Sequence, residues 1–251
     1  MKIIQTKDYS HLSRVAAEKI IHLIKQKPNA VLGLATGSTP KGVYEQLVLD
    51  HKQNQTTYQH IRTVNLDEYV GISADHPNSY HSFMRKNLFQ YIDIHPNHTH
   101  IPNGKTDNLD KECLEYDQLI HKLSGIDLQL LGIGHNGHIG FNEPHTSFSS
   151  QTHVVQLAQS TREANSRFFS SIEDVPSQAI TMGIQTIMNS KQILLLVSGK
   201  SKAKTLERLV NGFVTEAFPA SILQQHPNVT IIADEDAMSI LNINDSNFSC
   251  K

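Results

Sequence analysis

The sequence has no tryptophan, only two cysteines in 251 residues, and no apolar run that approaches the roughly 18 residues of a membrane-spanning helix. The two thiols, Cys113 and Cys250, cannot form the disulfide framework of a small secreted protein. The opening residues MKIIQTKDYS lack the apolar stretch of a secretory signal. These absences predict a cytoplasmic protein with no membrane partner.

An excess of charge of one sign is absent too, because 22 Lys and Arg stand against 24 Asp and Glu, for a formal net charge of −2. This balance creates no bulk field that attracts nucleic acid, so we expect no nucleic-acid partner. Any anionic ligand must then be held by a local site. The length suits one large core, and we expect a single α/β domain over residues 1–251.

Histidine, by contrast, is abundant, with 15 copies, and three of them cluster at His95, His98 and His100. The cluster lies in a segment rich in proline and asparagine and has no cysteine or carboxylate at a ligand-like helical spacing. It matches no zinc pattern, so we predict no metal there.

Apolar residues recur at helical and at strand spacing in alternation along the chain. Short apolar runs predict strands at 30–35, 61–69, 126–134, 152–158, 191–199 and 228–234. Helical spacing predicts helices at 12–27, 41–50, 79–92, 107–123, 161–172, 177–190 and 200–210. Such alternation indicates an open, doubly wound, Rossmann-like α/β fold with a mostly parallel sheet and helices on both faces. Ligands of such folds bind beyond the carboxyl ends of the strands.

The first polar motif at such an end is Thr36, Gly37, Ser38 and Thr39, after which Pro40 opens the next helix. Free N–H groups, hydroxyls and the positive end of a helix dipole make a ready phosphate site. The motif is neither a P-loop nor a dinucleotide-binding GxGxxG. A helix cap in an ordinary turn explains the same residues equally well, so composition leaves both interpretations open.

The second motif is the pair Asp67 and Glu68, which ends the strand predicted at 61–69. Adjacent carboxylates at a strand end are often helix caps or solvated turn residues. The functional alternative makes Asp67 a general base at the ligand-binding edge of the sheet. Because successive strand residues point in opposite directions, the two carboxylates are not expected to share one task.

The third motif, GIGHNGHIGFNEP at 132–144, places four glycines within nine residues. Its glycines permit tight turns and close approach of a ligand. His138 is the candidate for proton transfer near neutral pH, and Glu143 is a candidate to orient and tune the imidazole. A purely structural loop has no need of so many ionisable and amide groups, and we therefore predict catalysis here.

The fourth motif consists of cations. Arg167 lies in ANSRFF, and Lys202 follows the apolar strand that ends in VSG. A bound phosphate would pair with such groups. Each is more often a surface residue when taken alone, and spacing does not decide between Lys202 and its neighbours Lys200 and Lys204.

Together, LATGSTP, NLDEYVG, GIGHNGHIGFNEP, ANSRFF and SGKSKA resemble, in this order, the glucosamine-6-phosphate deaminase family. The resemblance covers nearly the whole chain, and its third motif is highly specific. It implies an open α/β fold and the conversion of glucosamine 6-phosphate and water to fructose 6-phosphate and ammonia, without a metal or organic cofactor. The implied partner is thus a small amino-sugar phosphate, and the oligomeric state is left open.

The resemblance also implies roles. Asp67 resembles the base that moves a proton between C2 and C1, His138 the group that assists ring opening, and Glu143 its carboxylate partner. The 36–39 loop, Arg167 and Lys202 resemble the phosphate site. One departure is Asn136, where many members carry aspartate. An asparagine accepts a hydrogen bond from the histidine but supplies no charge, so that task is expected to shift to Glu143.

Two alternative functions compete with this one. A 6-phosphogluconolactonase shares the architecture and a glycine-rich loop, but those proteins resemble one another in lacking the Phe141–Pro144 sequence FNEP. A non-catalytic sugar-phosphate sensor would be expected to carry a DNA-binding segment and to lose catalytic residues, whereas the base, histidine and glutamate are all present here.

Overall fold

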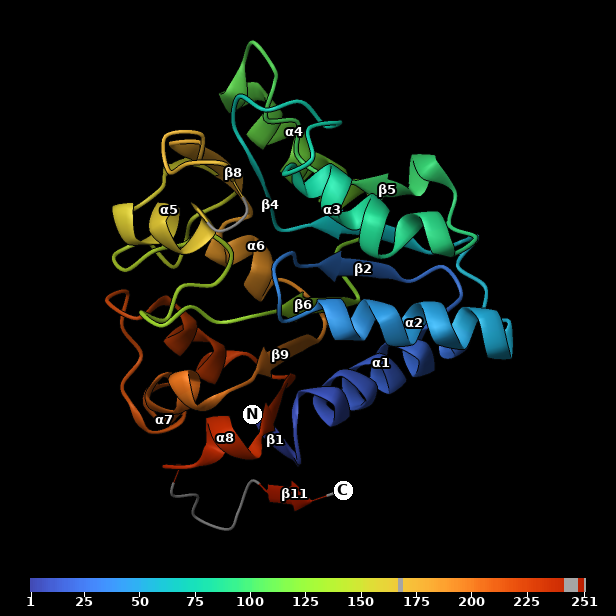
Figure 1. The fold of residues 1–251 in the computed structure, drawn as a ribbon, viewed down its shortest axis with the longest axis vertical. Helices are drawn as coiled ribbons and strands as arrows, with labels where there is room; N and C mark the ends of the chain where they lie inside the picture. The colour runs from blue at the N-terminus through green and yellow to red at the C-terminus, as the bar shows by residue number, and fades with distance from the viewer. Residues whose placement is uncertain (167–168, 242–247, 251) are drawn as a thin grey trace.

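The computed structural model describes residues 1–166, 169–241 and 248–250. Its central feature is a large sheet in which neighbouring strands are parallel (Figure 1). Across the sheet the strands stand in the order β11 (Phe248–Cys250), β1 (Lys2–Thr6), β10 (Val229–Asp234), β9 (Ile193–Val197), β6 (Leu128–Leu131), β2 (Val31–Leu34), β3 (Arg62–Asn65) and β5 (Thr99–His100). The predicted open, mostly parallel α/β sheet is confirmed.

Helices cover both faces of this sheet, which explains why its strands are continuous apolar runs rather than alternating ones. In β9, Leu194 and Leu196 pack into one core while Ile193, Leu195 and Val197 pack into the other. The first core lies under α1 (Tyr9–Gln26), α2 (Lys41–Asn54) and α3 (Tyr80–Asn87). The second lies under α4 (Leu109–Lys122), α6 (Ile184–Met188), α7 (Ala203–Asn211) and α8 (Glu235–Met238).

A second, smaller sheet is antiparallel and stands beside the first. Its strands are β4 (Asp67–Tyr69), β8 (Gln178–Thr181) and β7 (His153–Gln156), in that spatial order. Helix α5 (Gln159–Ser166) follows β7 in the chain. Short 3-10 turns complete the described elements: η1 (Phe89–Tyr91), η2 (Pro96–His98), η3 (Lys200–Lys202) and η4 (Pro219–Gln225).

Two predictions are wrong at this second sheet. The strand predicted at 61–69 is broken at Leu66, after which β4 leaves the parallel sheet and pairs with β8. Residues 177–190 form β8 and then α6 instead of one helix. The apolar spacing at 177–190 fits either structure, and burial between β4 and β7 decides for a strand, since Ala179 and Ile180 are fully buried.

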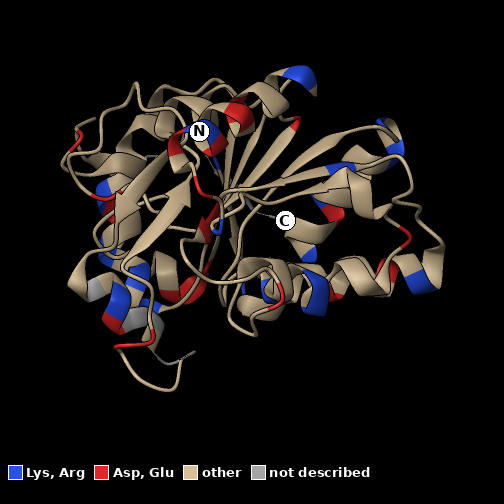
Figure 2. Cartoon of the chain, turned by 90° about the horizontal axis from the view of Figure 1, so that it is seen from above, with Lys and Arg blue, Asp and Glu red and all other residues tan. Residues whose placement is uncertain are grey.

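Smaller differences concern helix ends and short strands. The helix predicted at 79–92 ends at Asn87, and the one predicted at 161–172 is α5, whose last residue is Ser166. The sequence pattern does not predict the strands β1, β5 and β11. Acidic and basic residues are interspersed along the elements, as the balanced charge suggests (Figure 2). Within the residues described, no helix has the length and apolar character to cross a membrane.

The strand order reverses between β2 and β6, and this reversal positions the site. The chain runs from β2 outward to β3 and β5, then returns to place β6 on the other side of β2. At such a reversal the loops that follow the two adjacent strands diverge and leave a crevice at their carboxyl ends. The 36–39 loop follows β2, and the glycine-rich loop follows β6.

Candidate active site

A cavity of about 500 Å³ lies in this crevice. It gathers side chains from separate segments: the 36–39 loop after β2, Asp67 at the start of β4, Asn136 and His138 of the glycine-rich loop, and Lys202 of η3. Glu143 lies behind the cavity wall and touches Asn136. Arg167 lies outside the described residues, so its role stays a prediction.

Asp67 is aimed at the cavity and is 6% exposed. Its backbone pairs with Thr181 of β8, and its carboxylate has no hydrogen-bond partner among the described residues. Burial first, and then the charge of Glu68, raise the pKa of Asp67 to about 8. A carboxylate with this proton affinity is a much stronger base than an exposed one, and it is suited to moving a proton near neutral pH.

The raised pKa predicts that Asp67→Asn stabilises the fold, and more so at alkaline pH. In the unfolded chain the aspartate ionises with its ordinary pKa of 3.8, whereas the folded one stays protonated up to about pH 8. Between these values the folded state binds more protons, so the stability of the native protein falls as pH rises, and the variant escapes this loss. We expect a gain of about 1–3 kcal/mol at pH 9 and little at pH 5, measured by urea unfolding.

The matched control is Asp75→Asn, which removes a carboxylate whose side chain is 88% exposed. That variant should follow the wild type at both pH values. A stability gain of Asp67→Asn that does not change with pH would contradict the raised proton affinity.

Glu68 has a different task from Asp67, as the alternation of strand residues indicates. It is absent from the cavity lining, and its carboxylate accepts hydrogen bonds from the backbone N–H groups of Tyr69, Tyr80 and His81 at 2.8, 3.0 and 3.1 Å. Two of these donors belong to the first turn of α3. Glu68 therefore fastens β4 to the positive end of a helix.

The glycine-rich loop turns tightly after β6. The N–H of Gly134 donates to the carbonyl of His138 at 2.9 Å, and the N–H of Gly137 donates to the carbonyl of Gly134 at 3.0 Å. Gly137 has φ +87°, a conformation that other residues rarely adopt. A Cβ on Gly134 would lie 2.2 Å from the ring of His138. Glycine at these two positions lets the imidazole fold back over its own loop.

His138, Asn136 and Glu143 form one hydrogen-bonded chain. Asn136 Oδ1 lies 2.8 Å from His138 Nδ1, and Asn136 Nδ2 donates to Glu143 Oε2 at 2.6 Å. The bond to the carboxylate fixes the orientation of the amide, so Oδ1 faces the ring and Nδ1 must carry the hydrogen. The other ring nitrogen, Nε2, is left as the acceptor.

Burial lowers the pKa of His138 below 6.5, although the charge of Glu143 opposes this. The imidazole is therefore neutral at pH 7 and able to accept a proton. Its Nδ1 lies 3.6 Å from Glu143 Oε1, so the glutamate acts on it at longer range than the asparagine does. That Glu143 takes over the missing charge at Asn136 stays a prediction.

The 36–39 loop has the features of an anion site. Gly37 has φ +97°, and the N–H groups of Gly37, Ser38 and Thr39 have no partner among the described residues. Tyr9 of α1 holds the loop in place: its hydroxyl lies 3.0 Å from the carbonyls of both Ser38 and Thr39 and accepts from the N–H of Gly42 at 2.8 Å. The free N–H groups at the start of α2 then remain available to a phosphate.

Among the three candidate lysines, Lys202 is the one that lines the cavity. Its Nζ donates to the carbonyl of Ile133 at 2.8 Å and lies 3.4 Å from His135 Nδ1, while burial lowers its pKa. Lys200 and Lys204 do not line the cavity. The ammonium group of Lys202 therefore lies against the glycine-rich loop and lines the same cavity as the 36–39 loop.

Several residues of the site are not marked by the sequence pattern. Thr161 of α5 donates to Glu143 Oε1 at 2.6 Å, and Tyr80 of α3 and His135 line the cavity. Tyr9 supports the 36–39 loop from another helix. His135 lies within the predicted glycine-rich motif, but no local pattern identifies Thr161, Tyr80 and Tyr9, because each becomes part of the site only through packing of distant segments.

The histidine cluster at 95–100 is separate from this cavity. The rings of His95 and His98 have centroids 5.3 Å apart, and His98 Nδ1 lies 3.1 Å from the carbonyl of Gln59. In the described part of the chain, no group of three or more His, Cys, Asp or Glu is placed to hold a metal ion.

Comparison with known proteins shows the family of the chain. The family model described as glucosamine-6-phosphate isomerases/6-phosphogluconolactonase matches residues 7–232. The chain belongs to this family. Within the family it is 60% identical to a glucosamine-6-phosphate deaminase of Geobacillus sp. (strain WCH70), with 96% of each chain covered. It is 54% identical to glucosamine-6-phosphate deaminase 1 of Bacillus subtilis (strain 168), with 96% of this chain and 99% of the relative covered.

Solved structures of the glucosamine-6-phosphate isomerase/6-phosphogluconolactonase family separate into near and distant neighbours. A monomeric glucosamine-6-phosphate deaminase has a TM-score of 0.94 at 54% identity, covering 96% of this chain and all of that one. A 6-phosphogluconolactonase from Trypanosoma cruzi has a TM-score of 0.77 at 22% identity, covering 96% and 97%. The likeness to the lactonase is one of fold alone, whereas the two sequence relatives described above are deaminases.

Proposed function

We propose that this chain is a glucosamine-6-phosphate deaminase, which converts D-glucosamine 6-phosphate and water to D-fructose 6-phosphate and ammonia in amino-sugar catabolism. The observation that carries the proposal is the convergence in one cavity of a buried base, a neutral imidazole and an anion-binding loop. Each corresponds to one requirement of the reaction: a proton shift between adjacent carbons, ring opening, and a grip on the phosphate. The identity to deaminases over nearly the whole chain supports the same assignment.

Ring opening is assigned to His138. Its free Nε2 accepts the proton of the C1 hydroxyl and returns a proton to the ring oxygen, which gives the open-chain amino aldehyde. The hydrogen bond from Nδ1 to Asn136, backed by Glu143, holds the ring in the tautomer that this step needs. Glu143 also stabilises the transient imidazolium.

The proton shift is assigned to Asp67. In its ionised form it removes the proton from C2 of the open chain and delivers it to C1, while a proton passes from the amine nitrogen to O1, so that the aldose amine becomes a ketose-level imine. Water adds to C2 of the imine, and the resulting carbinolamine expels ammonia to leave fructose 6-phosphate. A carboxylate without hydrogen bonds to the protein is poorly stabilised and therefore takes up a proton readily.

The phosphate site is assigned to Thr36, Gly37, Ser38, Thr39, Arg167 and Lys202. The free N–H groups of the loop and the ammonium of Lys202 would hold the C6 phosphate. Holding the C6 phosphate places C1 and C2 of the sugar between Asp67 and His138. Such positioning lowers the activation barrier, because the substrate has already lost its translational and rotational freedom on binding.

An ammonia-release assay tests the proposal directly. Glucosamine 6-phosphate should give ammonia and fructose 6-phosphate without an added metal, whereas its N-acetylated form should give no ammonia. In the same preparation, 6-phosphogluconolactone hydrolysis should not exceed the spontaneous rate. Lactone hydrolysis without ammonia release would replace the proposal by its lactonase alternative.

Lys202→Ala is expected to raise KM by about 10- to 100-fold with little change in kcat, because it removes a charge-assisted contact that substrate and transition state share. Steady-state kinetics with glucosamine 6-phosphate measure the effect. The matched control is Lys204→Ala, whose side chain is exposed and lies outside the cavity. A large fall in kcat at unchanged KM would contradict the assignment of Lys202 as a phosphate contact. We expect the same rise in KM for Arg167→Ala.

Three further statements belong to this proposal. The chain acts as one deaminase-like domain over residues 1–251, it works in the cytoplasm, and its partners are small sugar phosphates rather than nucleic acids or membranes. The near-zero net charge supports the exclusion of nucleic acid, and binding of labelled DNA at low salt would contradict it.

A further inference from the structure

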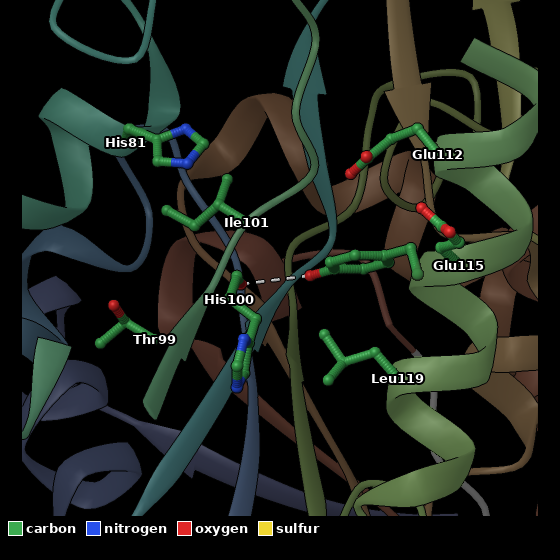
Figure 3. Close-up of a pocket in the computed structure, with 8 residues that line it drawn as sticks. His81, Thr99, His100, Ile101, Glu112, Glu115 and Leu119 are labelled. Atoms are coloured by element: carbon green, nitrogen blue, oxygen red, sulfur yellow. Dashed lines mark hydrogen bonds between the residues drawn. The ribbon is translucent and has the colours of Figure 1, made fainter. Parts of the chain in front are cut away.

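A second cavity, of about 240 Å³, lies between α3, β5 and α4, apart from the substrate site (Figure 3). His81 of α3 stands on one side of it, and Glu112 and Glu115 of α4 stand on the other. His81 Nδ1 lies 2.8 Å from Glu68 Oε2. The histidine therefore connects this open cavity with the residue next to Asp67 in the chain.

Glu68 is enclosed, whereas His81 is not. The Glu68 side chain is 2% exposed and that of His81 is 33% exposed. The other donors to Glu68 are the backbone N–H groups of Tyr69, Tyr80 and His81. His81 is the one side chain within the described residues that donates to this carboxylate.

We propose that His81 is a positioning residue, which holds Glu68 by a hydrogen bond that partly offsets the charge of the carboxylate and thereby favours ionisation of the catalytic base Asp67. The inference rests on the proposed function, since Asp67 is a base only in that reaction. Two adjacent buried carboxylates disfavour a second negative charge, and a donor on one of them relieves the other. Without His81, Glu68 would act on Asp67 with its charge less compensated.

The ionisable residues around His81 and Asp67 are consistent with an effect that passes from His81 through Glu68 to Asp67. His81 bonds to Glu68 of β4, and the other ionisable residues that line the same two cavities as His81 are His100 of β5, Glu112 and Glu115 of α4, and Asp75 and Arg85. None of these but Glu68 is adjacent to Asp67. Among the described residues, the charge of Asp67 also acts on Tyr44, Tyr69, Tyr80 and Tyr116, whose pKa values are raised by burial, so these tyrosines stay neutral. Glu68 is the charged neighbour through which Asp67 can be tuned.

The test is the pH profile of kcat/KM for His81→Leu, which lacks the donor. At pH 7 the variant should lose about 3- to 10-fold, because the ionisation of Asp67 moves up by about 0.5–1 pH unit. Above about pH 9.5 its activity should return to that of the wild type, since Asp67 is then ionised in both. The ionisations of the substrate are common to all variants and cancel in the ratio to the wild type.

Two variants serve as controls. His81→Asn keeps a side-chain N–H close to the position of Nδ1 and should stay within about twofold of the wild type. Arg85→Leu removes a charge from the same helix without touching Glu68 and should do the same. His81→Ala, which adds no apolar bulk, repeats the measurement if the leucine variant does not fold.

Two outcomes overturn the inference: a loss that is equal at every pH, which indicates a structural role, and no loss at all. Both are distinguishable from failure of the proposed function, in which the wild type itself would release no ammonia. A pH-dependent loss that His81→Asn does not rescue would also contradict the assigned hydrogen bond.

Discussion

Asp67→Asn is expected to lower kcat by about 10²- to 10⁴-fold while glucosamine 6-phosphate still binds, because the amide keeps the shape of the side chain but cannot accept the C2 proton. The carboxylate makes no hydrogen bond with the described protein, so its replacement breaks no network. The loss of activity therefore comes from the chemical step and not from a damaged fold, and it accompanies the gain in stability predicted above.

Proton exchange measures this loss at the atom concerned. In deuterated water the wild type should exchange the C2 hydrogen of glucosamine 6-phosphate, and Asp67→Asn should not. Isothermal titration of Asp67→Asn with glucosamine 6-phosphate, under conditions in which little substrate is turned over, measures the dissociation constant. It should lie within about threefold of the wild-type value, since the phosphate contacts are unchanged. Unaltered turnover in this variant would remove Asp67 from its assigned role.

His138→Gln is expected to produce the second large effect, a fall in kcat of about 10²- to 10⁴-fold, because glutamine cannot accept and return a proton. The physical reason differs from that for Asp67. His138 acts on the ring form of the sugar, and only the open chain presents C2 to the base. The control is His145→Asn, a histidine just after the glycine-rich loop that does not line the cavity and whose φ of +74° asparagine tolerates.

Anomer interconversion separates the two variants. Opening and closing of the ring interconverts the α and β anomers, and exchange NMR measures its rate without any reaction at C2. Asp67→Asn should still accelerate interconversion, whereas His138→Gln should not. If both variants lost it equally, or His138→Gln kept it, the division of labour between the two residues would be wrong.

Local sequence patterns predicted much of the fold. Alternating apolar periods predicted β2, β6, β9 and β10 and several of the helices between them, because buried parallel strands are continuous apolar runs. The same reasoning failed at 61–69 and 177–190. In both segments the apolar spacing is compatible with more than one structure, and pairing of β4 with β8 decides between them. That pairing joins residues more than 100 positions apart, which no local pattern records.

The site divides in a similar way. The motifs placed Asp67, His138 and the 36–39 loop at strand ends, and the rule for doubly wound sheets predicted that such ends form the ligand site. The choice of Lys202 among three lysines was beyond local reasoning, because it depends on which ammonium reaches the carbonyl of Ile133. The supporting contacts of Thr161, Tyr9 and His81 were equally hidden, since each comes from a different helix.

The sequence by itself determined the α/β class, the family and the main chemical groups of the site, because apolar period and motif chemistry are properties of neighbouring residues. Only the tertiary structure decided the proton affinities of Asp67 and His138 and the hydrogen-bonded chain through Asn136. Those properties depend on burial and on charges brought together from distant segments, and burial exists only once the sheets and helices have packed.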